Sequence, residues 1–271
     1  MADVMRVDAA LAARGLVASR EKARALIEAG LVTVNGIAVA KPAQKVGEGD
    51  TLEVLGDTHP YVSRGGLKLE KALRAFGADV SGLVCLDVGA STGGFTDVLL
   101  RSGASHVYAV DVGTEQLHES LAKDPRVTCM ERVNARTLNR AMFPQPPALA
   151  VMDGSFISIK LILPALFELL GEDGRVITLV KPQFEAGRQR IGKGGIVSKP
   201  EVHRQVLREI VGFPPTLGWR VRGLDFSPIA GGDGNLEFLA DIVPEGRSDA
   251  LIGPKEIDAA VKAAHDHKKE L

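Results

Sequence analysis

The stretch Asp87-Val-Gly89-Ala-Ser91-Thr92-Gly93-Gly94-Phe95 is a glycine-rich turn that decides the fold class. It follows the apolar run Val84 to Val88, which is typical of a buried strand, and it leads into Phe95 to Arg101, which is typical of a helix. In an open α/β sheet, nucleotide-like ligands bind at such a turn, at the carboxyl end of a strand. The stretch therefore predicts a ligand-binding turn in an α/β domain.

Strand-like and helical segments alternate around this turn. The other strand-like runs are Val107 to Asp111, Val127 to Met130, Leu149 to Asp153, Val176 to Lys181, Arg220 to Phe226 and Glu237 to Val243. Helical stretches lie near Leu67 to Phe76, Glu115 to Leu121, Ile159 to Leu170 and Glu201 to Val211. This alternation predicts a Rossmann-like α/β domain with a seven-stranded, mostly parallel sheet covered on both faces.

The spacing within the turn discriminates between cofactors. A dinucleotide site would have G-x-G-x-x-G, but position 91 is Ser and the pattern is G-x-x-x-G-G, while the lysine of a phosphate-binding loop is absent, so NAD and ATP are both disfavoured. Asp111 ends the second strand 22 residues after Gly89, where a carboxylate can accept both ribose hydroxyls. Together these features favour S-adenosylmethionine. The expected cofactor-binding residues are Asp87, Gly89, Ser91, Thr92, Gly93, Gly94, Phe95, Asp111, Val112 and Asn134.

Four charged residues lie at the ends of predicted elements. Asp153 and Lys181 each end an apolar strand, Lys68 begins the helix before the first strand, and Glu237 begins the last strand. One such charge is more often structural than catalytic. Two bases and two acids that converge on the sheet edge carrying the glycine-rich turn predict a reacting constellation, and we expect no metal site.

The N-terminal region has its own charge and pattern. Arg6 to Lys45 contains seven bases and three acids, a net charge of +4, although the whole chain has a net charge of -1. Two short helices are expected, from Asp8 to Arg14 and from a Ser19 cap to Gly30, followed by a hairpin around Asn35-Gly36 and a strand from Thr51 to Leu55. This pattern predicts a small α+β module that binds a partner through its basic residues, with a merely solvated basic helix as the alternative.

These segments define the expected domains. Residues 1–56 form the basic N-terminal module, 57–66 a linker, 67–248 the catalytic domain and 249–271 a C-terminal tail helix. A second basic block, Lys181 to Arg208, has seven bases and two acids, a net charge of +5, and contains Gly192-Lys-Gly-Gly195, which is expected to be a mobile loop.

Composition narrows the class of protein. With 271 residues, 45% hydrophobic and 25% charged, the chain is typical of a soluble globular protein. Cys85 and Cys129 lie in strand-like runs, which predicts buried thiols in a reducing compartment. The first residues lack the apolar core of a signal peptide, and no run approaches the ~20 apolar residues of a membrane span. We expect a cytoplasmic protein.

The order Lys, Asp, Lys, Glu around the glycine-rich turn resembles the FtsJ-type ribose 2′-O-methyltransferases. More specifically, the chain resembles the TlyA family, which also has a small N-terminal RNA-binding module like that of a small-subunit ribosomal protein. The motifs that carry this resemblance are Ser63-Arg-Gly-Gly-Leu-Lys-Leu69, Gly89-Ala-Ser-Thr-Gly-Gly-Phe-Thr96, Ser155-Phe-Ile-Ser158 and Lys181-Pro-Gln-Phe-Glu185. RNA is the partner that the family resemblance implies, and the expected RNA-binding residues are Arg6, Arg20, Lys22, Arg24, Lys41 and Arg64.

The resemblance implies a class I methyltransferase fold, Lys68, Asp153, Lys181 and Glu237 as a catalytic tetrad, and S-adenosylmethionine-dependent 2′-O-methylation of cytidine in ribosomal RNA. It implies the large subunit as substrate, with the small subunit as a further candidate. Three alternatives stay open: an RNA-binding factor without activity, a small-molecule methyltransferase, and the membrane-active haemolysin that the family's other label suggests, although no spanning segment supports it.

Overall fold

The computed structural model describes residues 4–17, 19–28, 30–39, 41–54, 59–231 and 234–270. The chain forms two compact units, residues 1–60 and 61–271. Their boundary falls inside the expected linker, and residues 55–58, which include the expected end of the Thr51 to Leu55 strand, lie outside the described residues.

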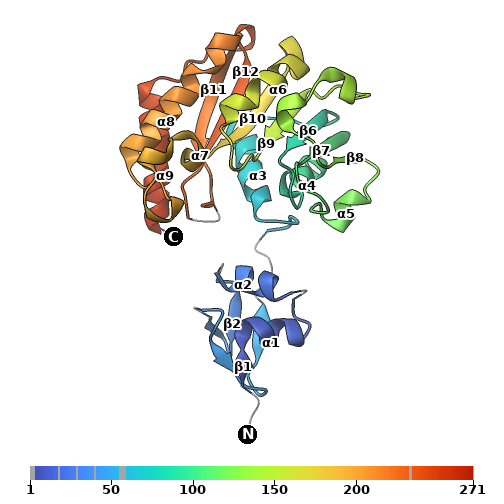
Figure 1. Ribbon diagram of the computed structural model, residues 1–271, viewed down its shortest axis with the longest axis vertical. Helices are drawn as coiled ribbons and strands as arrows, with labels where there is room; N and C mark the ends of the chain where they lie inside the picture. The colour runs from blue at the N-terminus through green and yellow to red at the C-terminus, as the bar shows by residue number, and fades with distance from the viewer. Residues whose placement is uncertain are drawn as a thin grey trace. The chain divides into compact units, whose positions relative to one another are not determined.

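The first unit packs two helices on small sheets (Figure 1). Its elements are β1 Met5–Arg6, α1 Val7–Ala13, α2 Arg20–Glu28, β2 Val32–Val34, β3 Ile37–Ala38, β4 Lys45–Val46 and β5 Leu52–Val54. The Ser19 hydroxyl accepts a hydrogen bond from the Lys22 amide at 3.1 Å, which caps α2 as expected. Asn35 and Gly36 both have positive φ, +51° and +77°, which is the conformation of a tight hairpin turn between β2 and β3.

The second unit contains the expected seven-stranded sheet. Its strands are β6 Val84–Val88, β7 His106–Val110, β8 Val127–Met130, β9 Leu149–Met152, β10 Arg175–Val180, β11 Trp219–Phe226 and β12 Phe238–Pro244. They lie in the order β11-β12-β10-β9-β6-β7-β8, and β12 runs antiparallel to both of its neighbours. Because β12 is reversed, its first residues lie at the edge where the parallel strands end.

Helices cover both faces of this sheet (Figure 1). They are α3 Gly65–Ala75, α4 Gly94–Arg101 and α5 Glu119–Ala122 on one face, and α6 Leu163–Leu170, α8 Pro200–Gly212 and α9 Pro254–Glu270 on the other, with a short α7 at Pro182–Glu185. Short 3-10 helices lie at Ala135–Thr137, Arg140–Met142, Ile159–Leu161, Gly171–Asp173, Arg188–Arg190, Lys193–Gly195, Pro214–Leu217 and Glu245–Arg247. Alternate strand residues enter the two hydrophobic cores, so the central strands are mostly apolar.

The structure differs from three expectations. The helix expected over Glu115 to Leu121 is reduced to α5, and Glu115 has a φ of +55°, which is incompatible with a helix. Cys85 is buried, but Cys129 is exposed because β8 is the edge strand of the sheet. The expected tail helix is present as α9, but it belongs to the second unit's core, where Ile257, Val261 and Ala264 are buried.

Candidate active site

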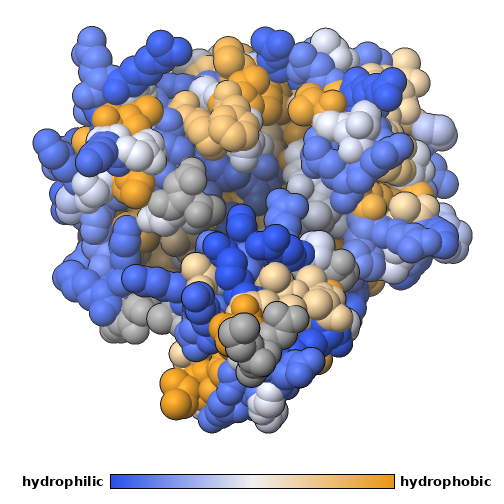
Figure 2. All heavy atoms as spheres, turned by 60° about the horizontal axis from the view of Figure 1, so that its bottom comes forward, coloured by the Kyte–Doolittle hydropathy of each residue, from blue (hydrophilic) through white to orange (hydrophobic). Residues whose placement is uncertain are grey.

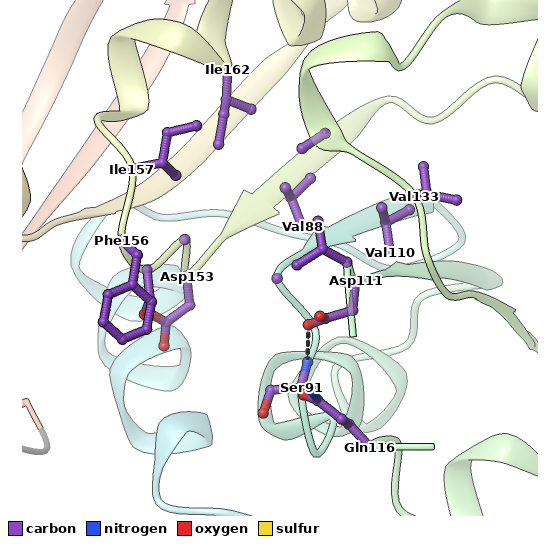
Figure 3. Close-up of a pocket in the computed structure, with 15 residues that line it drawn as sticks. Val88, Ser91, Val110, Asp111, Gln116, Val133, Asp153, Phe156, Ile157 and Ile162 are labelled. Carbon is purple, nitrogen blue, oxygen red and sulfur yellow. Dashed lines mark hydrogen bonds between the residues drawn. The ribbon is translucent and has the colours of Figure 1, made fainter. Parts of the chain in front are cut away.

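A cavity of ≈ 370 Å³ lies at the carboxyl ends of β6, β7 and β9 (Figure 3). Its apolar wall includes Val88, Val110, Val133, Ile157 and Ile162. In Figure 3, Asp153 and Phe156 lie on one side of the cavity, and Ser91, Asp111 and Gln116 lie on the other. A mostly apolar hollow with a few polar groups at its rim is the usual form of a small-molecule or cofactor site.

The glycine-rich turn depends on residues without a side chain. Gly89 has a φ of +78°, and a β-carbon there would lie 3.0 Å from the carbonyl oxygen of Asp153. Gly93 has a φ of +94° and ends the turn in the left-handed region, just before α4. A β-carbon at Gly93 would overlap Leu121 at 2.3 Å. The backbone can therefore close the floor of the cavity only with glycine at these positions.

Asp111 is held rigidly at the rim of the cavity. Its Oδ2 accepts a hydrogen bond from the Ser91 amide at 2.8 Å, drawn in Figure 3, and its Oδ1 accepts one from the Gly113 amide at 2.7 Å. Each carboxylate oxygen keeps a further acceptor position, so Asp111 can accept the two hydroxyls of a ribose. The apolar wall and this carboxylate fit the adenosine part of S-adenosylmethionine.

The other predicted cofactor residues divide into two groups. Gly89, Ser91 and Val112 line the cavity with Asp111, and a smaller adjoining cavity of ≈ 120 Å³ is lined by Gly89, Ser91, Thr92, Gly94, Phe95 and Asp153 among others. Gly93, Asp87 and Asn134 line neither cavity. The Asn134 side chain instead caps a 3-10 helix, since its Oδ1 accepts a hydrogen bond from the Arg136 amide at 3.1 Å.

Several lining residues were not singled out from the sequence. Gln116, Val133, Ala135 and Ile162 line the cavity. No signal in the sequence marks them, because they come from connections after β7, β8 and β9 that only the folded sheet brings together.

Asp87 lies fully buried beneath the turn. Its Oδ2 accepts a hydrogen bond from the Thr96 hydroxyl at 2.7 Å, and its Oδ1 has no hydrogen-bond partner among the described residues. Burial raises the pKa of Asp87 to about 7, and the charge of Asp153 adds to this, although the Thr96 hydrogen bond opposes it. The Asp87 carboxyl is thus placed to support the turn from below.

Asp87→Asn should change how stability depends on pH. An aspartate of the unfolded chain titrates near 3.8, so between that value and about 7 the folded protein keeps a proton that the unfolded chain has lost. Stability therefore falls as pH rises through this range. The free energy of unfolding of Asp87→Asn, measured in urea, should therefore increase relative to that of wild type by roughly 1 to 4 kcal/mol as the pH is raised from 4 to 8. If the difference in the free energy of unfolding between the two proteins stays constant across this pH range, the raised pKa of Asp87 is wrong.

The four charged residues meet beside the cavity. Lys68 Nζ donates a hydrogen bond to Glu237 Oε2 at 2.6 Å and lies 3.6 Å from Asp153 Oδ2. Lys181 Nζ lies 2.6 Å from Asp153 Oδ1 and donates to the Ser155 hydroxyl at 2.8 Å. Lys68, Lys181 and Glu237 are buried, and Asp153 reaches the cavity. The result is a continuous chain of alternating charges, Lys181 to Asp153 to Lys68 to Glu237.

The two lysines differ in their surroundings. Burial lowers the pKa of Lys68, but Asp153 and Glu237 outweigh it, so the net pKa is raised. Lys68 therefore stays protonated and cannot accept a proton near neutral pH. Lys181 directly follows β10 and has only one carboxylate, Asp153, in ion-pair contact among the described residues. Lys68 thus lies between two carboxylates, whereas Lys181 lies beside one.

Glu185 fixes the loop that carries Ser155 and Phe156. One carboxylate oxygen accepts from the Ser158 hydroxyl at 2.7 Å, and the other accepts from the Ile159 amide at 2.8 Å. Phe156 has a φ of +65°, is 90% exposed, and lies with its ring centroid 5.2 Å from that of Phe184. An exposed aromatic ring held in a strained conformation at the cavity mouth is suited to stacking on a planar ligand.

The glycine-rich stretch of the second basic block is anchored within the second unit. Asn235 accepts from the Val197 amide at 2.9 Å and donates to the Gly195 carbonyl at 3.1 Å. A ring nitrogen of buried His203 lies 3.1 Å from the Val197 carbonyl. The loop expected to be mobile therefore has fixed contacts at its carboxyl end. Two of them are made by Asn235, which lies two residues before Glu237.

The predicted RNA-binding residues are all exposed. Arg6, Arg20, Lys22, Arg24 and Lys41 belong to the first unit, and Arg64 precedes α3 in the second. The structure brings Arg6, Arg20 and Arg24 together around Asp8. No helix among the described residues is long and apolar enough to cross a membrane.

Comparison with known proteins accounts for both units. Residues 61–241 match the FtsJ-like methyltransferase family, and residues 5–52 match the S4 domain. The chain is 43% identical to the 16S/23S rRNA (cytidine-2′-O)-methyltransferase TlyA of Mycobacterium tuberculosis, across 97% of this chain and 98% of that protein. It is also 43% identical to hemolysin A of Brachyspira hyodysenteriae, across 88% of this chain and all of that protein.

A solved structure shares the whole fold. A protein of Streptococcus thermophilus, provisionally named a hemolysin, superposes with a TM-score of 0.80 at 46% identity, covering 100% of this chain and 98% of that one. The family matches, these relatives and the geometry of the glycine-rich turn all indicate the same family. The chain belongs to the FtsJ-like methyltransferase family, as a TlyA-type member in which an S4 domain precedes the methyltransferase domain.

Proposed function

We propose that this protein transfers a methyl group from S-adenosylmethionine to the 2′-hydroxyl of a cytidine in ribosomal RNA. The observation that carries the proposal is the ion-paired chain Lys181, Asp153, Lys68 and Glu237 beside a cavity suited to the cofactor. The relatives named TlyA are cytidine-2′-O-methyltransferases of rRNA. We propose large-subunit rRNA as the main substrate, and small-subunit rRNA as a further one because the M. tuberculosis protein is named for both.

The chemistry requires a positioned base more than a strong one. Bound S-adenosylmethionine supplies a methyl group already activated by its sulfonium. A ribose hydroxyl is a poor nucleophile, so the protein must align it and take its proton. We assign proton acceptance to Lys181 Nζ, because Lys68 is kept charged by two carboxylates. Asp153 orients Lys181, Glu237 orients Lys68, and Lys68 holds the hydroxyl or its neighbouring phosphate.

Asp111→Ala should weaken cofactor binding without affecting RNA binding. The substitution removes the carboxylate that would accept the ribose hydroxyls, at a cost of about 1.5 to 3 kcal/mol for bonds to a charged group. Calorimetric titration with S-adenosylmethionine measures this loss, and filter binding of an rRNA fragment provides the control. An equal loss of both affinities would count against separate sites. If wild type itself binds no S-adenosylmethionine, the alternative of an inactive RNA-binding factor is favoured.

Phe156→Ala should impair use of the RNA rather than of the cofactor. Its exposed ring stands at the cavity mouth, where it would stack on the target base, and such stacking is worth about 1 to 3 kcal/mol per base. We expect kcat/KM for RNA to fall about 10- to 100-fold. Phe156→Tyr should retain most activity because it keeps the ring. A fall confined to S-adenosylmethionine affinity would instead make Phe156 a cofactor contact.

Membrane lysis is a second candidate, because one relative is named hemolysin A. The face shown in Figure 2 is largely hydrophilic, with hydrophobic side chains in small separate groups. The ion-paired chain beside the cavity has a direct use in methyl transfer and none in lysis. A catalytic variant that loses methyl transfer but keeps any lytic effect would separate the two activities.

A further inference from the structure

A buried aspartate lies at the centre of the basic surface of the S4 domain. The Asp8 side chain has no exposed surface, and three arginines contact it. Arg6 donates through Nε and Nη2 to its two oxygens, both at 3.0 Å. Arg24 Nε donates to Oδ2 at 3.1 Å, and Arg20 Nη2 does so at 3.5 Å. We define Arg6, Arg20 and Arg24 as the arginine cluster.

The arginine cluster keeps free donors on its outer side. The side chains of Arg6, Arg20 and Arg24 are 44%, 55% and 53% exposed, although all of them contact a buried carboxylate. Each guanidinium has five N–H donors, and the contacts with Asp8 use one edge of it. The opposite edges reach solvent, and three positive charges against one negative charge leave +2.

Such an arrangement matches a phosphate of the RNA backbone. A planar guanidinium group binds phosphate through two parallel hydrogen bonds, so its plane must be oriented to align both bonds at once. A free arginine side chain must lose rotamer freedom when it binds, which reduces the affinity. Asp8 removes this cost in advance, because it holds three arginines from α2 and the end of β1 in one place.

We propose that Asp8 is a positioning residue for RNA binding, which orders the arginine cluster to hold one backbone phosphate. This inference deepens the proposed function and rests on its RNA substrate. The proposal predicts a change in RNA affinity opposite to the change expected from net charge alone. Removing an acid from a basic surface ordinarily strengthens RNA binding, because the attraction to phosphates grows. Removing this acid should weaken it.

Asp8→Asn in the full-length protein tests the sign of this effect. Asparagine has nearly the same shape but loses the charge that holds the arginines. We expect affinity for an rRNA fragment to fall about tenfold, the cost of ordering one or two long side chains again. The matched control is Glu28→Gln, which removes an acid from the exposed end of α2. This control should bind equally well or up to about twofold more tightly.

Methylation kinetics provide a second readout. In Asp8→Asn the loss should lie in the KM for RNA rather than in kcat, and S-adenosylmethionine affinity should match wild type. If Asp8→Asn binds RNA as tightly as Glu28→Gln, or more tightly, the positioning role is wrong. If wild type itself neither binds nor methylates the fragment, the proposed function fails instead, so the two failures are distinguishable.

A second variant covers the case in which Asp8→Asn unfolds the S4 domain, as circular dichroism would show. Arg24→Lys keeps the charge, but a lysine ammonium cannot present one edge to Asp8 and another to a phosphate. RNA affinity should fall about three- to tenfold while the dependence on salt keeps its slope, because the number of charges is the same. Unchanged affinity in Arg24→Lys would overturn the proposal.

Discussion

Lys181→Ala should reduce methyl transfer by about 10²- to 10⁴-fold, the usual contribution of a general acid or base. Lys181 directly follows β10, and its Nζ lies 2.6 Å from Asp153 Oδ1 at the cavity. Truncation removes the proposed proton acceptor from the edge of the sheet and leaves the hydrophobic cores intact. A single-turnover assay at saturating protein measures the chemical step separately from RNA binding.

Two further variants make this result specific. Lys255→Ala removes the same charge from the exposed start of α9 and should transfer methyl groups at the wild-type rate. Lys181→Arg keeps the charge but cannot give up its proton in a protein, so it should be nearly as slow as Lys181→Ala. If the arginine variant reacts at the wild-type rate, Lys181 only positions charge, and the base must be Asp153, Glu237 or water.

Deletion of residues 1–60 should abolish rRNA methylation while S-adenosylmethionine binding remains. The S4 domain has its own hydrophobic core, separate from the two cores of the methyltransferase domain, so each should fold alone. The deletion removes the basic surface that includes the arginine cluster. We expect a loss of about 10³-fold or more in kcat/KM for rRNA near physiological salt.

Calorimetry on the same truncated protein supplies the control, because an intact cofactor site shows that the methyltransferase domain is folded. A truncated protein that methylates rRNA at the normal rate would require another role for the S4 domain. A larger loss at low salt than at high salt would fit an electrostatic contribution from the deleted unit.

Much of the methyltransferase fold could be predicted from the sequence, because its strands are covered on both faces. The runs that became β6, β9 and β10 are mostly apolar, and each expected range lies within one or two residues of the observed strand. A charged residue that follows a buried apolar strand is expected at the edge of the sheet. Because parallel strands end at the same edge, Asp153 and Lys181 could be placed there together. The reversal of β12, which brings Glu237 to that edge, depends on sheet pairing.

Features that depend on tertiary contacts could not be predicted from the sequence. The strands β1 and β4 have two residues each, too few for a periodic pattern. Asp8 looked like one acid among bases, and its partners Arg20 and Arg24 are 12 and 16 residues away. That Lys68 lies closer to Glu237 than to Asp153 depends on distances that no spacing in the sequence could give.

The most direct test of the account identifies the methylated nucleoside. Ribosomal subunits from a strain that lacks the gene are incubated with the protein and S-adenosylmethionine carrying a labelled methyl group, and the rRNA is digested to nucleosides. The account predicts that the label appears in 2′-O-methylcytidine, and that Lys181→Ala leaves the rRNA unlabelled. Label in a base-methylated nucleoside, or an rRNA that stays unlabelled although the protein binds S-adenosylmethionine, would contradict it.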